Sequence, residues 1–270
     1  MLQFDFMRYA FIAGIFISLI CGVMGTFVVA RQTSFFTHTL SEIGFSGAAF
    51  GIFLGISPLL GMIIFTMTSA LFIGISGDRL SRREASISLF SGLFIGLGIL
   101  FLSLSSKQSS YATNILFGSI VGINIGNLYS LVALSILILI VITLLFRQLA
   151  YNSFDVTGSQ YNQHLNLLTS IVFLGLLALT ISVTSQIIGS LLIFVLLTIP
   201  ASSAKYYTSS LWKMIFLSTI FSLGGIWIGL YLSYITNWPV TFFITTVEAL
   251  IYCSALICRQ LQVSKISLKN

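Results

Sequence analysis

The chain consists largely of long apolar stretches separated by short polar or charged segments. A helix needs about 20 apolar residues to cross the hydrocarbon core of a bilayer. Dividing the apolar stretches at charges, prolines and polar corners predicts about nine membrane-spanning helices of this length. Their expected ranges are 9–30, 35–56, 58–76, 85–105, 127–146, 167–182, 186–200, 212–235 and 239–258.

Some of these boundaries depend on individual residues. Pro58 separates the second helix from the third, because proline lacks a backbone N–H and disfavours helical geometry in the preceding Ser57. The polar corner Val183-Thr184-Ser185 separates two shorter helices. The segment 111–126 is rich in glycine and asparagine and too polar for a lipid-facing span, so it is a candidate re-entrant segment packed against protein. The polar stretch 147–166 is expected to be a water-exposed loop.

The composition is that of a membrane protein throughout. Hydrophobic residues make up 57% of the 270 residues and charged residues 7%, whereas soluble proteins carry about 25% charged residues. No polar stretch is long enough for a separate soluble domain. We therefore expect an all-α polytopic membrane protein in which residues 1–270 form a single transmembrane domain in contact with lipid.

The distribution of positive charge predicts the orientation of the helices. With nine spans and the N-terminus outside the cell, all of the 12 Lys and Arg residues except Arg8 and Lys107 fall on the cytoplasmic side. Lysine and arginine concentrate in the cytoplasmic loops of membrane proteins. This bias places the C-terminus in the cytoplasm and accounts for the net charge of +6 without a nucleic-acid partner. The expected location is the cell membrane, as a multi-pass protein.

His38 and Glu42 lie four residues apart in the second expected helix, and therefore on one helix face. An ionisable group in hydrocarbon costs about 2.5–3.5 kcal/mol on insertion scales. Imidazole and carboxylate are common metal ligands, so the pair is a candidate for the path of a cation. The alternative is a structural, hydrogen-bonded pair that caps the inner end of the helix. The small residues Gly44, Gly47 and Gly51 that follow indicate close packing of this helix against other helices.

Glu248 is the other acidic residue inside an expected span, near the middle of the last helix. It is a candidate second carboxylate of the path, or a proton site. The structural alternatives are a protonated side chain hydrogen-bonded between helices and a side chain that faces a water-filled cleft.

Motifs for catalysis are missing from the sequence. It contains no Gly-x-x-x-x-Gly-Lys-Ser/Thr phosphate loop, no Gly-x-Ser-x-Gly elbow and no His-Glu-x-x-His. The cysteines Cys21, Cys253 and Cys258 match no metal-finger spacing and are expected to act as small apolar side chains. We therefore expect a transport subunit rather than an enzyme, with no permanently bound cofactor and with any ATP hydrolysis on a separate chain.

Several segments spread over most of the chain match one known family. They are 25–31 (GTFVVAR), 39–41 (TLS), 46–51 (SGAAFG), 55–58 (GISP), 116–120 (LFGSI), 189–192 (GSLL) and 196–204 (LLTIPASSA). The last two are the most specific. Together they resemble the membrane permeases of ATP-binding-cassette importers for zinc and manganese, the ABC-3 metal-ion permeases, and look most similar to zinc-type members.

The resemblance implies a homodimeric permease, a cytoplasmic ABC ATPase and an extracellular metal-binding lipoprotein that delivers the ion. The cargo expected first is zinc, because imidazole with carboxylate suits zinc, and manganese is second because it favours oxygen-rich sites. His38 and Glu42 of each copy would lie near the dimer axis. The inner segment 201–212 would be the region coupled to the ATPase, with the alternative of an ordinary positively charged connector. Its candidate contacts are Ala201, Ser202, Lys205, Tyr206, Tyr207 and Trp212.

The chain departs from the family pattern at the proposed metal positions. Family members usually read Asp-x-Leu-Ser-His in the second helix, whereas this chain has His38 and Glu42 there, so imidazole and carboxylate have exchanged places. The outer corner 237–241 also lacks the family's usual richness in proline and glycine. Two rival functions remain: an ion-coupled secondary carrier that uses Glu248, and an ABC permease for a metal chelate or small organic nutrient.

Overall fold

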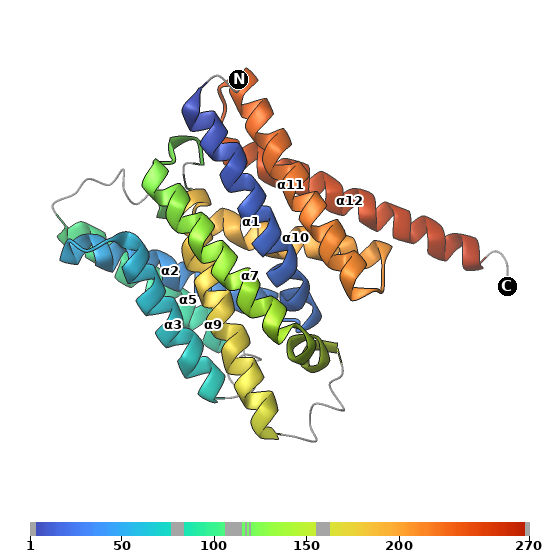
Figure 1. Ribbon diagram of the computed structural model, residues 1–270, viewed down its shortest axis with the longest axis horizontal. Coiled ribbons are helices and arrows are strands. Elements are labelled where there is room, and N and C mark those ends of the chain that lie inside the picture. Colours follow the sequence, from blue (N-terminus) through green and yellow to red (C-terminus); the bar gives the residue numbers. More distant parts are fainter. Residues whose placement is uncertain are drawn as a thin grey trace.

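The computed structural model describes residues 4–76, 84–105, 115–116, 118, 120–154 and 163–267. Within these ranges all regular secondary structure is helical, which confirms the all-α class (Figure 1). The elements are α1 (Asp5–Ala30), α2 (Ser34–Leu54), α3 (Pro58–Ser76), α5 (Glu84–Leu104), the short 3-10 helix η1 (Ile120–Gly122), α7 (Ile125–Phe154), α9 (Gln163–Ile188), α10 (Ser190–Tyr207), α11 (Leu211–Thr236) and α12 (Val240–Ser267).

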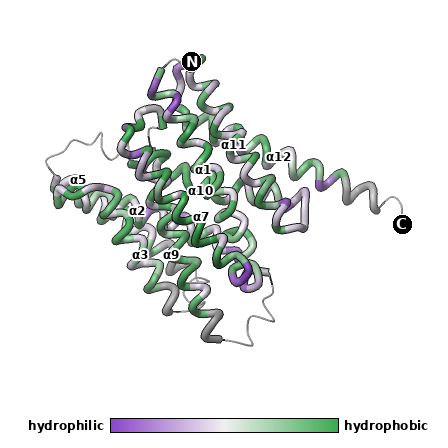
Figure 2. Tube along the Cα trace, in the orientation of Figure 1, coloured by the Kyte–Doolittle hydropathy of each residue, from purple (hydrophilic) through white to green (hydrophobic). Residues whose placement is uncertain are grey.

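The helices have the length and composition of a membrane-embedded bundle. Among the described residues, α1, α7, α9, α10, α11 and α12 are long and apolar enough to cross a membrane, and α3 and α5 contain shorter apolar stretches. Figure 2 shows hydrophobic residues along much of the helical trace. The class of membrane protein is therefore confirmed. The number of about nine spans and the orientation of the termini stay predictions.

The helix break expected at Ser57-Pro58 is present. α2 ends at Leu54, where Gly55 adopts a left-handed conformation with φ 74° and its N–H binds the carbonyl of Ile52. Glycine adopts this conformation without a steric penalty and commonly follows the last residue of a helix. α3 then begins at Pro58, a position where the missing proline N–H costs no helical hydrogen bond.

The prediction of a corner between two helices at Val183-Thr184-Ser185 is wrong. These residues continue α9 as far as Ile188, and the break falls at Gly189, which has φ 87°. The hydroxyl of Thr184 donates to the carbonyl of Thr180 at 2.5 Å, so its polar group is satisfied inside the helix. The polar side chains at 183–185 therefore do not end α9. The helix ends at Gly189, because glycine adopts a positive φ without a steric penalty.

The C-terminal ends of two helices extend further than the sequence predicts. α10 contains Pro200 in its interior and continues to Tyr207, so that most of 201–212 is the end of this helix rather than a loop. α7 begins at Ile125 and reaches Phe154, into the stretch expected to be water-exposed loop. The helix α10 tolerates proline because it is held on several sides, packing against α1, α2, α9, α11 and α12, and packing routinely overrides local propensity.

The described part of the candidate re-entrant segment lies against protein. Gly118 has φ 71°, and a Cβ at this position would come within 2.1 Å of the carbonyl carbon of Ile188. Ile120 and Ile123 are buried in the main core, and η1 contacts α1. Residues 111–114, 117 and 119 lie outside the described residues, so a complete re-entrant path stays a prediction.

Two groups of helices lie on either side of a centre formed by α1 and α10 (Figure 1). α2 packs closely on α3 and α5, whereas α12 packs on α10 and α11. The centre is tight: a Cβ at Gly25 of α1 would come within 2.2 Å of the carbonyl oxygen of Leu197 in α10. Each side of this centre carries a buried acidic residue, and the two sites can be compared directly.

Candidate metal site at the start of α2

The predicted pair lies in the first turns of α2. The Nδ1 atom of His38 is 3.4 Å from the Oε1 atom of Glu42, as expected for residues one helical turn apart. α2 is buried along most of its length, and Glu42 is buried with it at 7% exposure. The His38 side chain is 35% exposed. The imidazole is therefore the accessible member of the pair and the carboxylate the enclosed one.

A serine from another helix holds the second carboxylate oxygen. Ser91 of α5 donates its hydroxyl hydrogen to the Oε2 atom of Glu42. A hydrogen bond to a charged group contributes about 1.5–3 kcal/mol, and here it fixes the orientation of the carboxylate. Sequence reasoning missed Ser91, because it lies 49 residues from Glu42 among many other serines and glycines.

The beginning of α10 closes another side of the site. The ring of Phe194 meets the His38 imidazole edge-to-face, with 5.0 Å between ring centroids. One turn along α2, the Ser41 hydroxyl donates to the carbonyl of Ser190, the first residue of α10. The segment 189–192, one of the most specific matches to the permease family, therefore packs directly beside the helix that carries the pair.

The described residues of one chain offer two ligands at this site, His38 and Glu42. Among the described residues, no group of three or more His, Cys, Asp or Glu side chains lies close enough to hold one. Zinc in proteins usually has four ligands, and His38 and Glu42 supply two. The arrangement can bind an ion only in passing, or together with ligands from outside the chain.

Glu248 lies elsewhere. It is on α12, is fully buried and faces Gly225 of α11. α2 packs on α1, α3, α5, α9 and α10, whereas α12 packs on α10 and α11. The structure therefore does not bring Glu248 to His38 and Glu42 within one chain.

The candidate contacts of the ATPase differ in their accessibility. Lys205, Tyr207 and Trp212 are exposed, whereas Ala201 is buried and cannot contribute to a docking surface in this conformation. Tyr206 is half-buried, and its hydroxyl lies 3.4 Å from that of Tyr252 on α12. The exposed members are consistent with a docking surface at the end of α10 and the start of α11.

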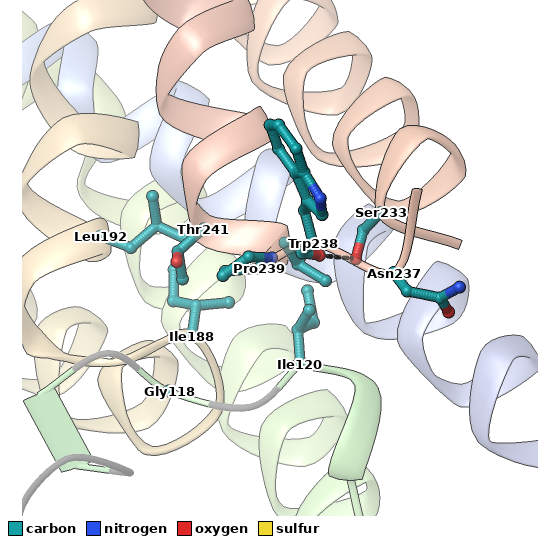
Figure 3. Close-up of a pocket in the computed structure, with 10 residues that line it drawn as sticks. Gly118, Ile120, Ile188, Leu192, Ser233, Asn237, Trp238, Pro239 and Thr241 are labelled. Carbon is teal, nitrogen blue, oxygen red and sulfur yellow. Dashed lines mark hydrogen bonds between the residues drawn. The ribbon is translucent and has the colours of Figure 1, made fainter. Parts of the chain in front are cut away.

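A separate cavity of about 430 Å³ lies at the corner between α11 and α12 (Figure 3). Its wall includes the break between α9 and α10 at Ile188, Gly118 and the segment 237–241. The hydroxyl of Ser233 donates to the carbonyl of Trp238 at 2.6 Å and fixes this corner. The lining contains no acidic residue, cysteine or histidine, so it does not extend the metal site.

An ionisable pair on a buried helix of a membrane bundle is typical of an ion or substrate pathway. The chain matches the ABC 3 transport family over residues 3–259. It therefore belongs to this family, as the resemblance of its motifs predicted.

Individual proteins of known name are similar in sequence to nearly the whole chain. The chain is 31% identical to the manganese import system permease protein ScaB of Streptococcus gordonii, with 93% of the chain and 90% of the relative covered. It is 27% identical to the high-affinity zinc uptake system membrane protein ZnuB of Buchnera aphidicola, with 95% and 96% covered. A solved structure of PsaBC from Streptococcus pneumoniae in complex with Fab matches with a TM-score of 0.82 and 27% identity, over 94% of this chain and 91% of that one. The chain is thus a membrane transport subunit and not an enzyme.

Proposed function

We propose that the chain is the permease of an ATP-binding-cassette importer for divalent transition-metal ions. The observation that carries this proposal is the His38–Glu42 pair, held at 3.4 Å on a buried helix in a member of the ABC 3 transport family. Family membership also argues against an ion-coupled secondary carrier. The relatives named as permeases or uptake components for manganese and zinc support the choice of cargo.

The proposed working form is a homodimer with two further partners. Two ligands per chain become four when two copies bring their pairs together, which is the usual number for zinc. A cytoplasmic ATPase would dock on the surface that includes Lys205, Tyr207 and Trp212, which are exposed at adjacent helix ends. An extracellular metal-binding lipoprotein would deliver the ion.

The site would bind the ion briefly. A divalent ion that loses water would receive an oxygen from Glu42 and a nitrogen from His38 in its neutral form, since a protonated imidazole cannot act as a ligand. Ser91 would keep the carboxylate oriented toward the path. ATP binding and hydrolysis on the partner chains would shift the permease between outward- and inward-open states, and the small number of ligands favours release.

Zinc and manganese are the two candidate cargoes, each with its own support. The nitrogen and carboxylate donors suit zinc, whereas manganese prefers more oxygen-rich sites. Against this, the relative with 31% identity is named for manganese import and the one with 27% for zinc uptake. The donor chemistry and the relatives thus favour different ions.

The test is metal uptake by cells that lack their own permease and express this chain with its ATPase and binding protein. We expect saturable uptake of manganese or zinc, with the preferred ion identified by competition between the two. His38→Ala should abolish it. Ser103→Ala is a control, because Ser103 is exposed on α5 and its hydroxyl donates to the carbonyl of Leu100 in its own helix. Normal metal uptake by His38→Ala would refute the proposal and favour a chelate or organic nutrient.

A further inference from the structure

The seam between α11 and α12 contains a second buried acidic site. Glu248 is 0% exposed, and its Oε1 atom lies 2.3 Å from the position that a Cβ would take at Gly225. One turn along the seam, a Cβ at Gly229 would come within 2.5 Å of the Ile244 side chain. The absence of a side chain at Gly225 leaves room for the carboxyl group of Glu248, and the absence of one at Gly229 leaves room for Ile244.

Several polar groups at this seam have no partner among the described residues. Neither oxygen of Glu248 has a hydrogen-bond partner there, and neither do the hydroxyls of Ser218 and Ser222. Ser218, Ser222 and Gly225 follow one another at helical spacing along the face of α11 that meets α12. Both serines are fully buried. Most buried polar groups in proteins are hydrogen-bonded, so a group of unpaired ones requires an explanation.

The described residues around Glu248 provide neither a positive charge nor a set of metal ligands that could neutralise its carboxylate. From α1, the titratable group near enough to interact electrostatically with Glu248 is Cys21, which supplies no positive charge. α11 presents serines and glycine, and Tyr252, one turn further along α12, pairs instead with Tyr206 of α10. No third metal ligand lies close among the described residues. An unpaired carboxylate in an apolar interior is costly, and a proton neutralises it without any further ligand.

We propose that Glu248 forms a proton-binding site between α11 and α12, separate from the metal path. The carboxyl group is neutral while the two helices pack as they do here. When α12 moves away from α11 during the transport cycle, water reaches the group, the O–H bond breaks and the proton passes to water as the carboxylate forms. The unpaired serine hydroxyls of α11 are then available to hydrogen-bond the entering water.

The position of α12 fits such a movement. α12 lies at the edge of the bundle (Figure 1) and packs on α10 and α11. At Gly225 and Gly229 of α11 the contact with α12 involves no side chain of α11, so a small shift can separate the helices at these two positions. The proposal requires a transport cycle but does not depend on which ion the permease carries.

The test is infrared difference spectroscopy on the permease bound to its ATPase in lipid nanodiscs, comparing the nucleotide-free complex with the complex trapped by a non-hydrolysable ATP analogue. We expect the carbonyl stretch of a protonated carboxylic acid in one state and its loss in the other. Glu248→Gln should remove this difference band. Glu42→Gln should leave it in place, which separates it from the metal site.

Two further variants keep the test decisive. Glu248→Asp retains an acid, so a shifted band is expected, and it serves if Glu248→Gln fails to fold. Ser222→Ala should leave the band of the protonated acid in place, because the Ser222 hydroxyl does not bond the acid in this conformation. The proposal is overturned if the wild-type complex has no such band, if nucleotide leaves it unchanged, or if it persists in Glu248→Gln. Because no metal is transported in this experiment, its failure is distinguishable from failure of the metal-import proposal.

Discussion

Glu42 and Glu248 are the same side chain in two different buried environments. Glu42 lies on α2 with one oxygen 3.4 Å from His38 and the other bonded to Ser91. Glu248 lies on α12 with both oxygens unpartnered among the described residues. At the first site, neighbouring side chains contact both carboxylate oxygens and orient them. At the second site, Gly225 leaves space for the carboxyl group, and no described side chain bonds it. Burial alone therefore does not predict what an acidic residue does in a membrane bundle.

The difference originates in the neighbouring helices. α5 brings a serine hydroxyl to Glu42, so the charged form is partly compensated. α11 brings glycine to Glu248, which provides space and no donor. A carboxylate that keeps its charge needs partners, whereas a neutral acid needs mainly the absence of steric conflict. Substitutions on each side can test this contrast.

The largest effect is expected from Glu42→Gln. Removing the negative charge leaves an amide in place of a metal ligand, and metal uptake should fall by about 100-fold or more, since even indirect partners of metal ligands contribute about 10- to 100-fold. Uptake of manganese and zinc in complemented cells measures this. Glu248→Gln is the comparison and should retain far more uptake. Equal losses in the two variants would remove the distinction between the sites.

The next effect concerns the glycine seam. Gly225→Ala places a methyl group against the Glu248 carboxyl group and should lower the free energy of unfolding by about 1–3 kcal/mol, as overpacking does. Gly224→Ala is the matched control, because a Cβ there meets nothing within 4 Å. Thermal unfolding of the purified protein, followed by size-exclusion chromatography, measures both. Equal melting temperatures for the two variants would contradict the packing described for α12.

Ser91→Ala should have a smaller effect. The Oε2 atom of Glu42 loses its donor, so the carboxylate is less well oriented and metal affinity should fall about 10-fold, equivalent to about 1.4 kcal/mol. In uptake kinetics the change should appear mainly as a higher KM, and Ser91→Thr should restore much of the affinity because it keeps a hydroxyl. Ser103→Ala on the same helix should behave as wild type. An unchanged KM in Ser91→Ala would show that the serine does not position the carboxylate.

The smallest effect is expected for the stability of Glu248→Gln. Glutamine is uncharged and has nearly the shape of a neutral glutamic acid, so the free energy of unfolding should change by less than in Gly225→Ala. Glu248→Leu, which removes the polar group but keeps a similar volume, provides the comparison. A large loss of stability in Glu248→Gln would mean that the carboxylate is charged and paired, contrary to the proton-site proposal.

Much of the fold could be predicted from the sequence because its signals are local. Apolar stretches of bilayer length predicted the helical membrane class, and Pro58 marked a helix boundary that the structure also has. The four-residue spacing of His38 and Glu42 placed both on one face, which the distance of 3.4 Å confirms. The predicted corner at 183–185 failed, because hydroxyls can bond within a helix, and Gly189 ends it instead.

By itself, the sequence determined the all-helical membrane class, the family and the His38–Glu42 pair, since composition and short spacings are properties of the chain alone. Only the tertiary structure decided which distant residues surround each carboxyl group. It brought Ser91 to Glu42 and placed Gly225 beside Glu248, and it put the two acidic residues on opposite sides of α10, on α2 and α12. The physical reason is that partners of a buried charge come from helix packing, and helix packing is set by small residues and close backbone approach rather than by sequence separation.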